Sequence, residues 1–214
     1  SRGMRLFEQN PGGAPANLLA AAAKFGRKTA FIGKVGKDMH GDFLKETLIR
    51  AGINTDNLIQ DEKYFTTLAF VSLKENGERE FAFARKPGAD TNLCMKEIDP
   101  EILENTRVFH VGSLSLTDDP SRTATYEAIN IARNSGAVIS YDPNYRAALW
   151  SDPETAQLRM QSLIPYVDMM KISDEETSLL TPYQDPEEAI QYLLRQGVHL
   201  VAVTLGRDGA LIGK

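Results

Sequence analysis

Near its start the chain reads GGAPAN at residues 12–17, followed by an alanine-rich apolar stretch to Phe25 and by Gly26. Paired glycines let the backbone approach a ligand closely, because they carry no Cβ. Pro15 suits the first turn of a helix and Gly26 suits its end, so the stretch predicts a tight turn followed by a helix. Asn17 then lies in the first turn, with an amide that can donate and accept hydrogen bonds. The pattern favours a polyhydroxylated ligand, although a strand-to-helix connection that only requires glycine looks the same.

Beyond this turn, short apolar segments typical of buried strands alternate with segments bounded by helix-start and helix-stop residues. The expected strands cover residues 29–35, 108–111, 138–141, 169–172 and 198–204, and another begins at 210–212. The expected helices cover 42–50, 119–136, 152–165 and 185–197, with Ser173 as the cap of one more. This alternation predicts an α/β fold with a mostly parallel sheet and helices on both faces. Ligands of such sheets bind beyond the carboxyl ends of the strands.

One segment departs from the alternation. Residues 67–73 and 78–85 alternate apolar and polar side chains on either side of Asn76-Gly77. Because glycine readily supplies the positive φ that a tight turn needs, the pattern predicts a β-hairpin at about residues 66–86. We find no long linker or internal repeat, so residues 1–214 are expected to form a single domain.

The composition is that of an ordinary globular protein. Of 214 residues, 42% are hydrophobic and 25% are charged, and the net charge is 24 − 29 = −5. An acidic chain argues against non-specific binding to nucleic acid or to an anionic membrane. Cys94 is the only cysteine, so no internal disulfide can form and a cytoplasmic location is expected. No apolar run approaches the roughly 20 residues that span a bilayer.

Several common site patterns do not occur in the sequence. The residues GKVGKD at 33–38 are not a Walker A loop, because the spacing differs and no Ser or Thr follows the lysine. No Gly-x-Gly-x-x-Gly follows the first strand, which argues against a dinucleotide-dependent dehydrogenase. The scattered His40, His110 and His199 have no zinc-site spacing. We interpret His110, on an apolar strand, as a hydrogen-bonded core histidine.

The stretch from Gly12 to Gly36 resembles the first signature of the ribokinase-like (PfkB) carbohydrate kinases. The residues that match it are Gly12, Gly13, Asn17, Ala20, Gly26 and Gly36. Within that family the chain is most similar to bacterial and plant fructokinases. The resemblance implies a ribokinase-like fold and a sugar kinase that transfers a phosphoryl group from ATP to a sugar hydroxyl, with fructose as the expected substrate. It also implies Mg²⁺, and a monovalent cation such as K⁺ is a further expectation.

The resemblance implies sugar contacts by residues that are far apart in the chain: Gly12, Gly13, Asn17, Arg85, Ser113 and Arg146. Arg146 ends DPNYR at 142–146, which resembles a segment of fructokinases and ketodeoxygluconate kinases; an Asx-type turn with an exposed arginine is the alternative. Ketodeoxygluconate kinases usually carry tyrosine where this chain has Phe83, so the missing hydroxyl favours a neutral sugar. In the family the hairpin forms a small β lid over the sugar and often pairs with a second subunit.

On the ATP side the resemblance implies contacts by Ser173, Thr204, Gly206 and Gly209. The N–H groups of a glycine turn can bind phosphate, although a tight turn between two strands has the same pattern. Ser173 stands where many family members have asparagine. Glu176 is expected to organise Mg²⁺ through water, but acids in a first helical turn are equally explained by the helix dipole.

The family begins with a strand that carries a sugar-binding acid and continues to a second signature, a glycine-rich anion hole with the catalytic aspartate. Neither is found among the 214 residues. The chain is therefore expected to be a central fragment, lacking the N-terminal strand and the C-terminal part, with the catalytic aspartate beyond Lys214. The alternatives are a ketodeoxygluconate, ribose or nucleoside kinase of the same fold, a non-catalytic sugar-binding or regulatory protein, and a structural piece of a lid-mediated homodimer.

Overall fold

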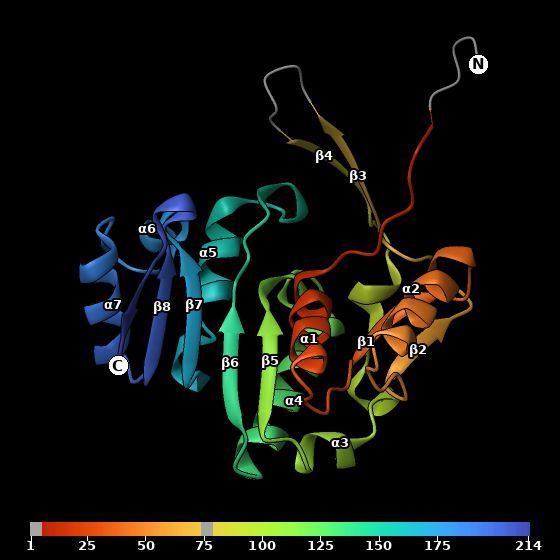
Figure 1. The fold of residues 1–214 in the computed structure, drawn as a ribbon, viewed down its shortest axis with the longest axis horizontal. Coiled ribbons are helices and arrows are strands. Elements are labelled where there is room, and N and C mark those ends of the chain that lie inside the picture. The colour runs from red at the N-terminus through yellow and green to blue at the C-terminus, as the bar shows by residue number, and fades with distance from the viewer. Residues whose placement is uncertain (1–5, 74–78) are drawn as a thin grey trace.

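The computed structural model describes residues 6–73 and 79–214 and is shown in Figure 1. The strands are β1 Gly33–Gly36, β2 Leu58–Asp61, β3 Leu68–Leu73, β4 Arg79–Ala84, β5 Val108–Gly112, β6 Val138–Asp142, β7 Met169–Ser173, β8 Leu200–Thr204 and β9 Ala210–Gly213. The α-helices are α1 Ala14–Lys24, α2 Met39–Arg50, α3 Pro100–Glu104, α4 Ser121–Asn134, α5 Pro153–Gln161, α6 Thr177–Leu180 and α7 Pro186–Arg195. None of these helices, within the described residues, is long and apolar enough to cross a membrane.

The main sheet has the strand order β5-β6-β7-β8-β9. The first four strands are parallel, and β9 runs antiparallel to β8. The predicted mostly parallel sheet is therefore confirmed, and so are the strands expected between residues 108 and 212, each within two residues. The expected helices after Asp119, Asp152 and Asp185 are also present.

Helices cover both faces of the sheet near β5: α1 and α4 both contact this strand, and in Figure 1 they lie beside it, with α1 in front of α4. Gly112 faces α1, because a Cβ added there would lie 3.8 Å from Pro15. Val111 points to the other face, where it joins Ile129 of α4 in the main buried cluster. Successive side chains of a strand point to opposite faces, so one strand supports both layers.

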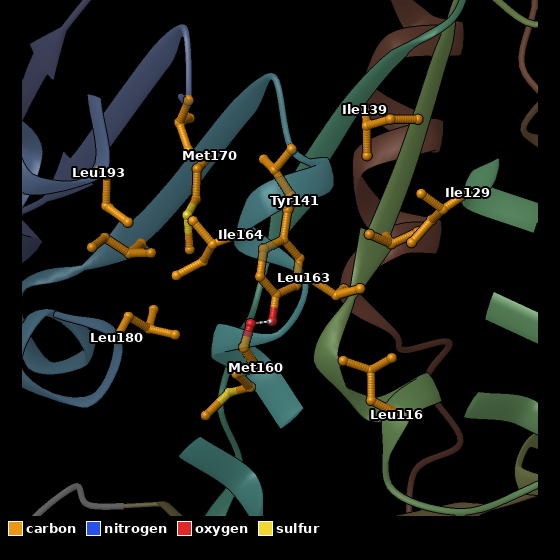
Figure 2. Packing of buried hydrophobic residues seen from close by; sticks show 14 of the residues in the cluster. Leu116, Ile129, Ile139, Tyr141, Met160, Leu163, Ile164, Met170, Leu180 and Leu193 are labelled. Carbon is orange, nitrogen blue, oxygen red and sulfur yellow. Dashed lines mark hydrogen bonds between the residues drawn. The ribbon is translucent and has the colours of Figure 1, made fainter. Parts of the chain in front are cut away.

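The main core lies between the sheet, α4 and α5 (Figure 2). Its centre is Tyr141, whose side chain is fully buried and whose hydroxyl donates to the Met160 carbonyl at 3.4 Å. Burial raises the pKa of this phenol well above its usual range. A smaller cluster of Val35, Leu48, Ile53 and Leu58 packs α1 and α2 against β1 and β2.

The N-terminal part of the chain required two corrections. The expected strand at 29–35 is β1 at 33–36, and Ala30 forms only an isolated bridge with Asn54. Strand β2, which pairs in parallel with β1, was not predicted, because its sequence LIQD is too short to show a strand pattern. Helix α2 begins at Met39 rather than at residue 42, since Asp38 caps it by accepting from the N–H groups of His40 and Gly41.

Strands β3 and β4 form an antiparallel hairpin that we call the lid. In Figure 1 it projects away from the main sheet, above α1 and β1. Ala69 is paired with Phe83 and Val71 with Phe81, so these four side chains share one face of the lid. Phe70 lies on the opposite face. The two predicted strands are confirmed, whereas the predicted Asn76-Gly77 turn falls outside the described residues.

Candidate active site

The site is built where four parallel strands end at the same edge of the sheet. Gly112 at the end of β5 is paired with Asp142 at the end of β6, and Ser173 at the end of β7 is paired with Thr204 at the end of β8. The expected sugar and ATP ligands from Ser113 to Gly209 therefore lie in these strand ends or in the loops that directly follow them. This is the edge at which open α/β sheets bind ligands.

A hollow of about 330 Å³ opens at the β5 and β6 end of this edge. It is lined by Gly13, Ala14, Asn17, Phe81, Phe83, Leu114, Asn144, Arg146 and Leu149. The lining comes from the start of α1, from the lid and from the loops that follow β5 and β6. Three of the expected sugar-binding residues, Gly13, Asn17 and Arg146, are thus brought together although they span more than half of the sequence.

The GGAPAN turn has the form that its sequence predicts. Gly13 has φ +110°, which disfavours residues with a side chain, and it is the N-cap of α1. Gly13 has no side chain to cap this helix, so within the described residues the N–H groups of its first turn are without a capping side chain and suit a bound hydroxyl or water. The Asn17 N–H donates to the Gly13 carbonyl at 3.0 Å, and its exposed side chain reaches the cavity. Gly12 adjoins the cavity without lining it.

The DPNYR loop after β6 is held by hydrogen bonds and by packing of Tyr145 against the main buried cluster. The Asn144 N–H donates to Asp142 Oδ1 at 3.1 Å, which closes the Asx-type turn given above as the alternative for this segment. Asn144 has φ +45°, a conformation that asparagine tolerates better than most residues. The following Arg146 is exposed and donates to the Tyr145 carbonyl at 2.8 Å. Asn144 was missed as a lining residue, although an asparagine within a predicted turn is a signal that could have identified it.

Glu176 connects the β6 loop to the end of β7. Its carboxylate is buried at 7% exposure and accepts from the Tyr145 N–H at 2.7 Å and from the Ser173 N–H and hydroxyl at 2.8 and 3.0 Å. A carboxylate offers about four lone-pair positions, so three donors leave room for little more than one water-mediated contact. Within residues 6–73 and 79–214 no group of three His, Cys, Asp or Glu residues could hold a metal ion.

Asp142 and Lys171 add charge next to this connection. Lys171 Nζ lies 3.3 Å from Asp142 Oδ2. Burial raises the pKa of the Asp142 carboxyl, against the opposing effect of Lys171. On the neighbouring strand, His110 Nδ1 lies 3.0 Å from the Ser140 hydroxyl, as expected of a hydrogen-bonded core histidine. Burial lowers the pKa of His110.

The expected ATP-binding residues lie at the β7 and β8 end of the same edge. Gly206 and Gly209 have φ +58° and +101°, and the turn is closed by a hydrogen bond from the Leu205 N–H to the Gly209 carbonyl at 2.8 Å. The Thr204 hydroxyl donates to the Ile172 carbonyl at 3.3 Å. The turn is exposed and connects β8 to β9, so it combines the expected glycine geometry with a plain structural role.

Besides Gly12, two further expected sugar ligands do not line the cavity. Ser113 is fully buried; its N–H donates to the Pro143 carbonyl at 3.2 Å, and its hydroxyl has no partner among the described residues. The Arg85 guanidinium is also buried and donates to Asp90, to Thr117 and to the Leu114 carbonyl. The expected direct contact between Arg85 and a sugar therefore has no support in this geometry, because these internal acceptors hold its guanidinium.

Apolar lining residues were also missed by the sequence analysis. Leu114, Leu149 and Phe81 form part of the cavity wall. Side chains of this kind carry no motif, because any large apolar residue can close a cavity.

Comparison with known proteins agrees with this geometry. Probable fructokinase-5 of Arabidopsis thaliana is 40% identical over 204 residues, which cover 95% of this chain and 63% of that protein. A Vibrio cholerae fructokinase structure with fructose, ADP and a calcium ion has a TM-score of 0.85 at 36% identity, covering 95% of this chain and 65% of that one. A double mutant of that enzyme holds fructose, ADP and a potassium ion and has a TM-score of 0.86 at 36% identity, with the same coverage.

A third relative is an uncharacterized sugar kinase from Pyrococcus horikoshii in complex with ATP, which has a TM-score of 0.82 at 32% identity and is covered to 67% by the whole of this chain. The chain spans about three fifths of the length of the curated relatives that it matches. The profile described as "pfkB family carbohydrate kinase" matches residues 4–214. The strand order, the cavity at the carboxyl edge and these matches together show that the chain belongs to the pfkB family of carbohydrate kinases.

Proposed function

We propose that this protein is a fructokinase, which transfers the γ-phosphoryl group of ATP to a primary hydroxyl of fructose. The observation that carries the proposal is the cavity itself. It brings a helix start, the lid phenylalanines and the β6 loop together, beside the strand ends expected to hold ATP. Phosphoryl transfer depends mainly on alignment and on charge stabilisation, so a site that holds two substrates side by side suits it.

On the sugar side, the polar groups of the cavity are those that hydroxyl groups need. The side-chain amides of Asn17 and Asn144 can each donate and accept. Among the lining residues that the structure describes, Arg146 alone is charged, and its planar fork can hold a substrate oxygen or the transferring phosphoryl group. Phe81 and Phe83, with rings 6.0 Å apart and nearly parallel, cover the cavity with an apolar surface. Gly12 and Ser113 are proposed to support this site from adjacent positions.

On the ATP side, we propose that Ser173, Thr204, Gly206 and Gly209 contact the nucleotide. Ser173 and Thr204 are register partners on adjacent strands, and both turn glycines have positive φ. When bound, Mg²⁺ neutralises the charge that develops on the phosphates. The hydrogen-bonded Glu176 fits a role through water rather than as a direct ligand, so we expect the nucleotide phosphates to provide most of the coordination. A monovalent cation such as K⁺ belongs to the same proposal.

The residue that accepts the proton of the attacking hydroxyl is not assigned within the cavity. Its lining contains no Asp, Glu or His among the described residues. We therefore propose that the base is an aspartate outside the 214 residues, as the family resemblance implies. A cytoplasmic location and a homodimer formed through the lid complete the proposal; the exposed Phe70 and Val71 of the lid support a paired lid.

The test is ADP formation from Mg·ATP by the full gene product, with fructose, ketodeoxygluconate, ribose or adenosine as the acceptor. We expect the highest kcat/KM with fructose. Asn17→Ala should raise the KM for fructose about tenfold or more, because it removes a hydrogen-bonding amide from the cavity. Asn105→Ala, which changes an exposed asparagine at the end of α3, is the matched control and should behave as the wild type. No acceptor-dependent ADP formation, or a clear preference for another acceptor, would contradict the proposal.

A further inference from the structure

The two strands of the lid meet the body of the protein at one carboxylate, that of Asp90. Asp90 Oδ1 accepts from the Thr67 hydroxyl at 2.5 Å, and Oδ2 accepts from Arg85 Nε at 2.8 Å and lies 2.7 Å from Arg85 Nη2. Thr67 directly precedes β3 and Arg85 directly follows β4, so the lid enters and leaves the body through these two residues. Asp90 itself lies in a short 3-10 helix, Ala89–Asn92, that packs against β1.

Arg85 also connects the lid to the wall of the sugar cavity. Its Nη1 donates to the Thr117 hydroxyl at 2.9 Å and its Nη2 to the Leu114 carbonyl at 2.8 Å. Leu114 lines the cavity from the segment after β5. Along an extended strand, Phe81, Phe83 and Arg85 leave on the same side. Arg85 therefore fixes the strand that carries both cavity phenylalanines to the opposite wall of the same cavity.

The arrangement is too buried to be an incidental surface pair. Arg85 is 6% exposed, and a guanidinium in that position depends on all of its acceptors. Gly88 shows how tightly the residues are packed: a Cβ there would lie 2.3 Å from the Thr67 hydroxyl and 2.6 Å from Asp90 Oδ1. A side chain at residue 88 would therefore disturb the hydrogen bond between Thr67 and Asp90.

We infer that Arg85, Asp90 and Thr67 form a latch that positions the lid over the sugar cavity. Arg85 is then a positioning residue, which acts on the sugar through Phe81 and Phe83 and not by touching it. The inference rests on the proposed function for its effect on fructose, but not for its effect on the lid. It differs from the role that the family resemblance implies for Arg85, because the geometry directs the guanidinium to Asp90, Thr117 and Leu114.

The first test is hydrogen exchange of the lid amides in the full gene product, compared between the wild type and Asp90→Asn. We expect the amides of β3 and β4 to exchange about tenfold faster in the variant, while those of β6 and β7 keep their rates. Glu62→Gln is the control, because it removes the carboxylate of the exposed Lys37–Glu62 pair, and it should change nothing. Thr67→Val, which removes one hydrogen bond of the latch, should act in the same direction and serves if Asp90→Asn does not fold.

The second test is fructose affinity, measured by calorimetry for Arg85→Lys, Asp90→Asn and the double variant. A latch predicts that each single variant raises the Kd for fructose about tenfold and that the double variant is no worse than the weaker binder of the two. The Kd should increase by the same factor for any sugar that the protein binds, because Arg85 contacts no individual hydroxyl.

Opposite results would overturn the latch. These are unchanged lid exchange in both Asp90→Asn and Thr67→Val, or effects of Arg85→Lys and Asp90→Asn on the Kd that simply add. A wild-type protein that binds no fructose would instead remove the proposed function together with the sugar effect. The exchange measurement would still decide whether the latch holds the lid, so the two failures can be told apart.

Discussion

The main sheet and the lid are stabilised by different kinds of contact. Ile139, Tyr141 and Leu163 of the main core are fully buried. In the lid, by contrast, Phe70, Val71 and Phe81 are 42%, 50% and 42% exposed. A two-stranded hairpin has no core of its own, so the lid depends on what it contacts at its base.

Stability and the proposed sugar binding are therefore expected to depend on largely separate sets of residues. The main sheet supplies a rigid edge, with strand ends in register, on which polar groups are placed. The lid contributes cavity wall but little buried area, and hydrogen bonds at Asp90 determine its position. Substitutions in the main sheet should therefore change mainly the free energy of unfolding, and substitutions in the lid mainly the KM for the sugar.

The largest loss of stability is expected in the main core. Leu163→Ala removes a fully buried side chain and should lower the free energy of unfolding by about 2–5 kcal/mol, since it loses apolar burial and leaves a cavity. Urea unfolding followed by circular dichroism measures this loss. Leu158→Ala, at a position that is 65% exposed, is the control and should stay within about 0.5 kcal/mol of the wild type. Equal losses would contradict the assignment of the core.

A smaller loss is expected at the polar edge of the sheet. Glu176→Gln should lower the free energy of unfolding by about 1–3 kcal/mol, because an amide nitrogen would face the N–H or O–H donors that the carboxylate now satisfies. The kcat/KM for fructose should fall as well, since the β6 loop that carries Arg146 loses its anchor. The exposed neighbour Glu175→Gln is the matched control. A stable Glu176→Gln protein that had lost only its Mg²⁺ dependence would point to metal binding alone.

In the lid, a substitution should change the KM for fructose more than the free energy of unfolding. Phe83→Ala should change the free energy of unfolding by less than about 1 kcal/mol, because this side chain is only half-buried. The KM for fructose should rise about tenfold, since part of the cavity cover is removed. Phe70→Ala, on the opposite face of the lid, should leave that KM unchanged. Steady-state kinetics on the wild type, Phe83→Ala and Phe70→Ala measures the change in KM. If Phe83→Ala lost as much stability as Leu163→Ala, the proposed difference between lid and core would be wrong.

The sequence predicted the regular part of the molecule well. From Val108 to Thr204, strands and helices alternate, and Asp152 and Asp185 cap α5 and α7 where the sequence places the starts of these helices. Local signals of this kind do not depend on distant residues. The displaced β1 and the unpredicted β2 are the opposite case, because four-residue strands are too short for a pattern and become strands only by pairing with each other.

Residues of the site could be predicted from the sequence only where the backbone conformation requires a particular residue type. Gly13 and Asn17 could be identified, since a turn with positive φ requires glycine before the helix. The apolar wall formed by Leu114 and Leu149 could not, because its role follows from tertiary packing. The partner of a charged residue is equally hard to predict. The position of Arg85 at the end of a lid strand was evident from the sequence, but its pairing with Asp90 is determined by the fold.

The smallest expected effect is a pH dependence of the free energy of unfolding, which arises from His110 on β5. Burial lowers the pKa of His110 in the folded protein, whereas the unfolded chain has the ordinary value of about 6.5. The unfolded state therefore takes up a proton first, and stability should fall as the pH drops from about 7 through that value. Asp142 and Lys171 also lie at this end of the strands. The raised pKa of Asp142 acts in a more acidic range and with the opposite sign.

His110→Gln removes the titrating group and should flatten the slope of unfolding free energy against pH between about 7 and 5. The exposed His199→Gln is the control for the loss of a histidine from the surface. Urea unfolding at a series of pH values measures both slopes. If His110→Gln kept the wild-type slope, the histidine would not be the group that resists protonation, and the buried face between β5 and α1 would have to be far more accessible to water than the core behind it.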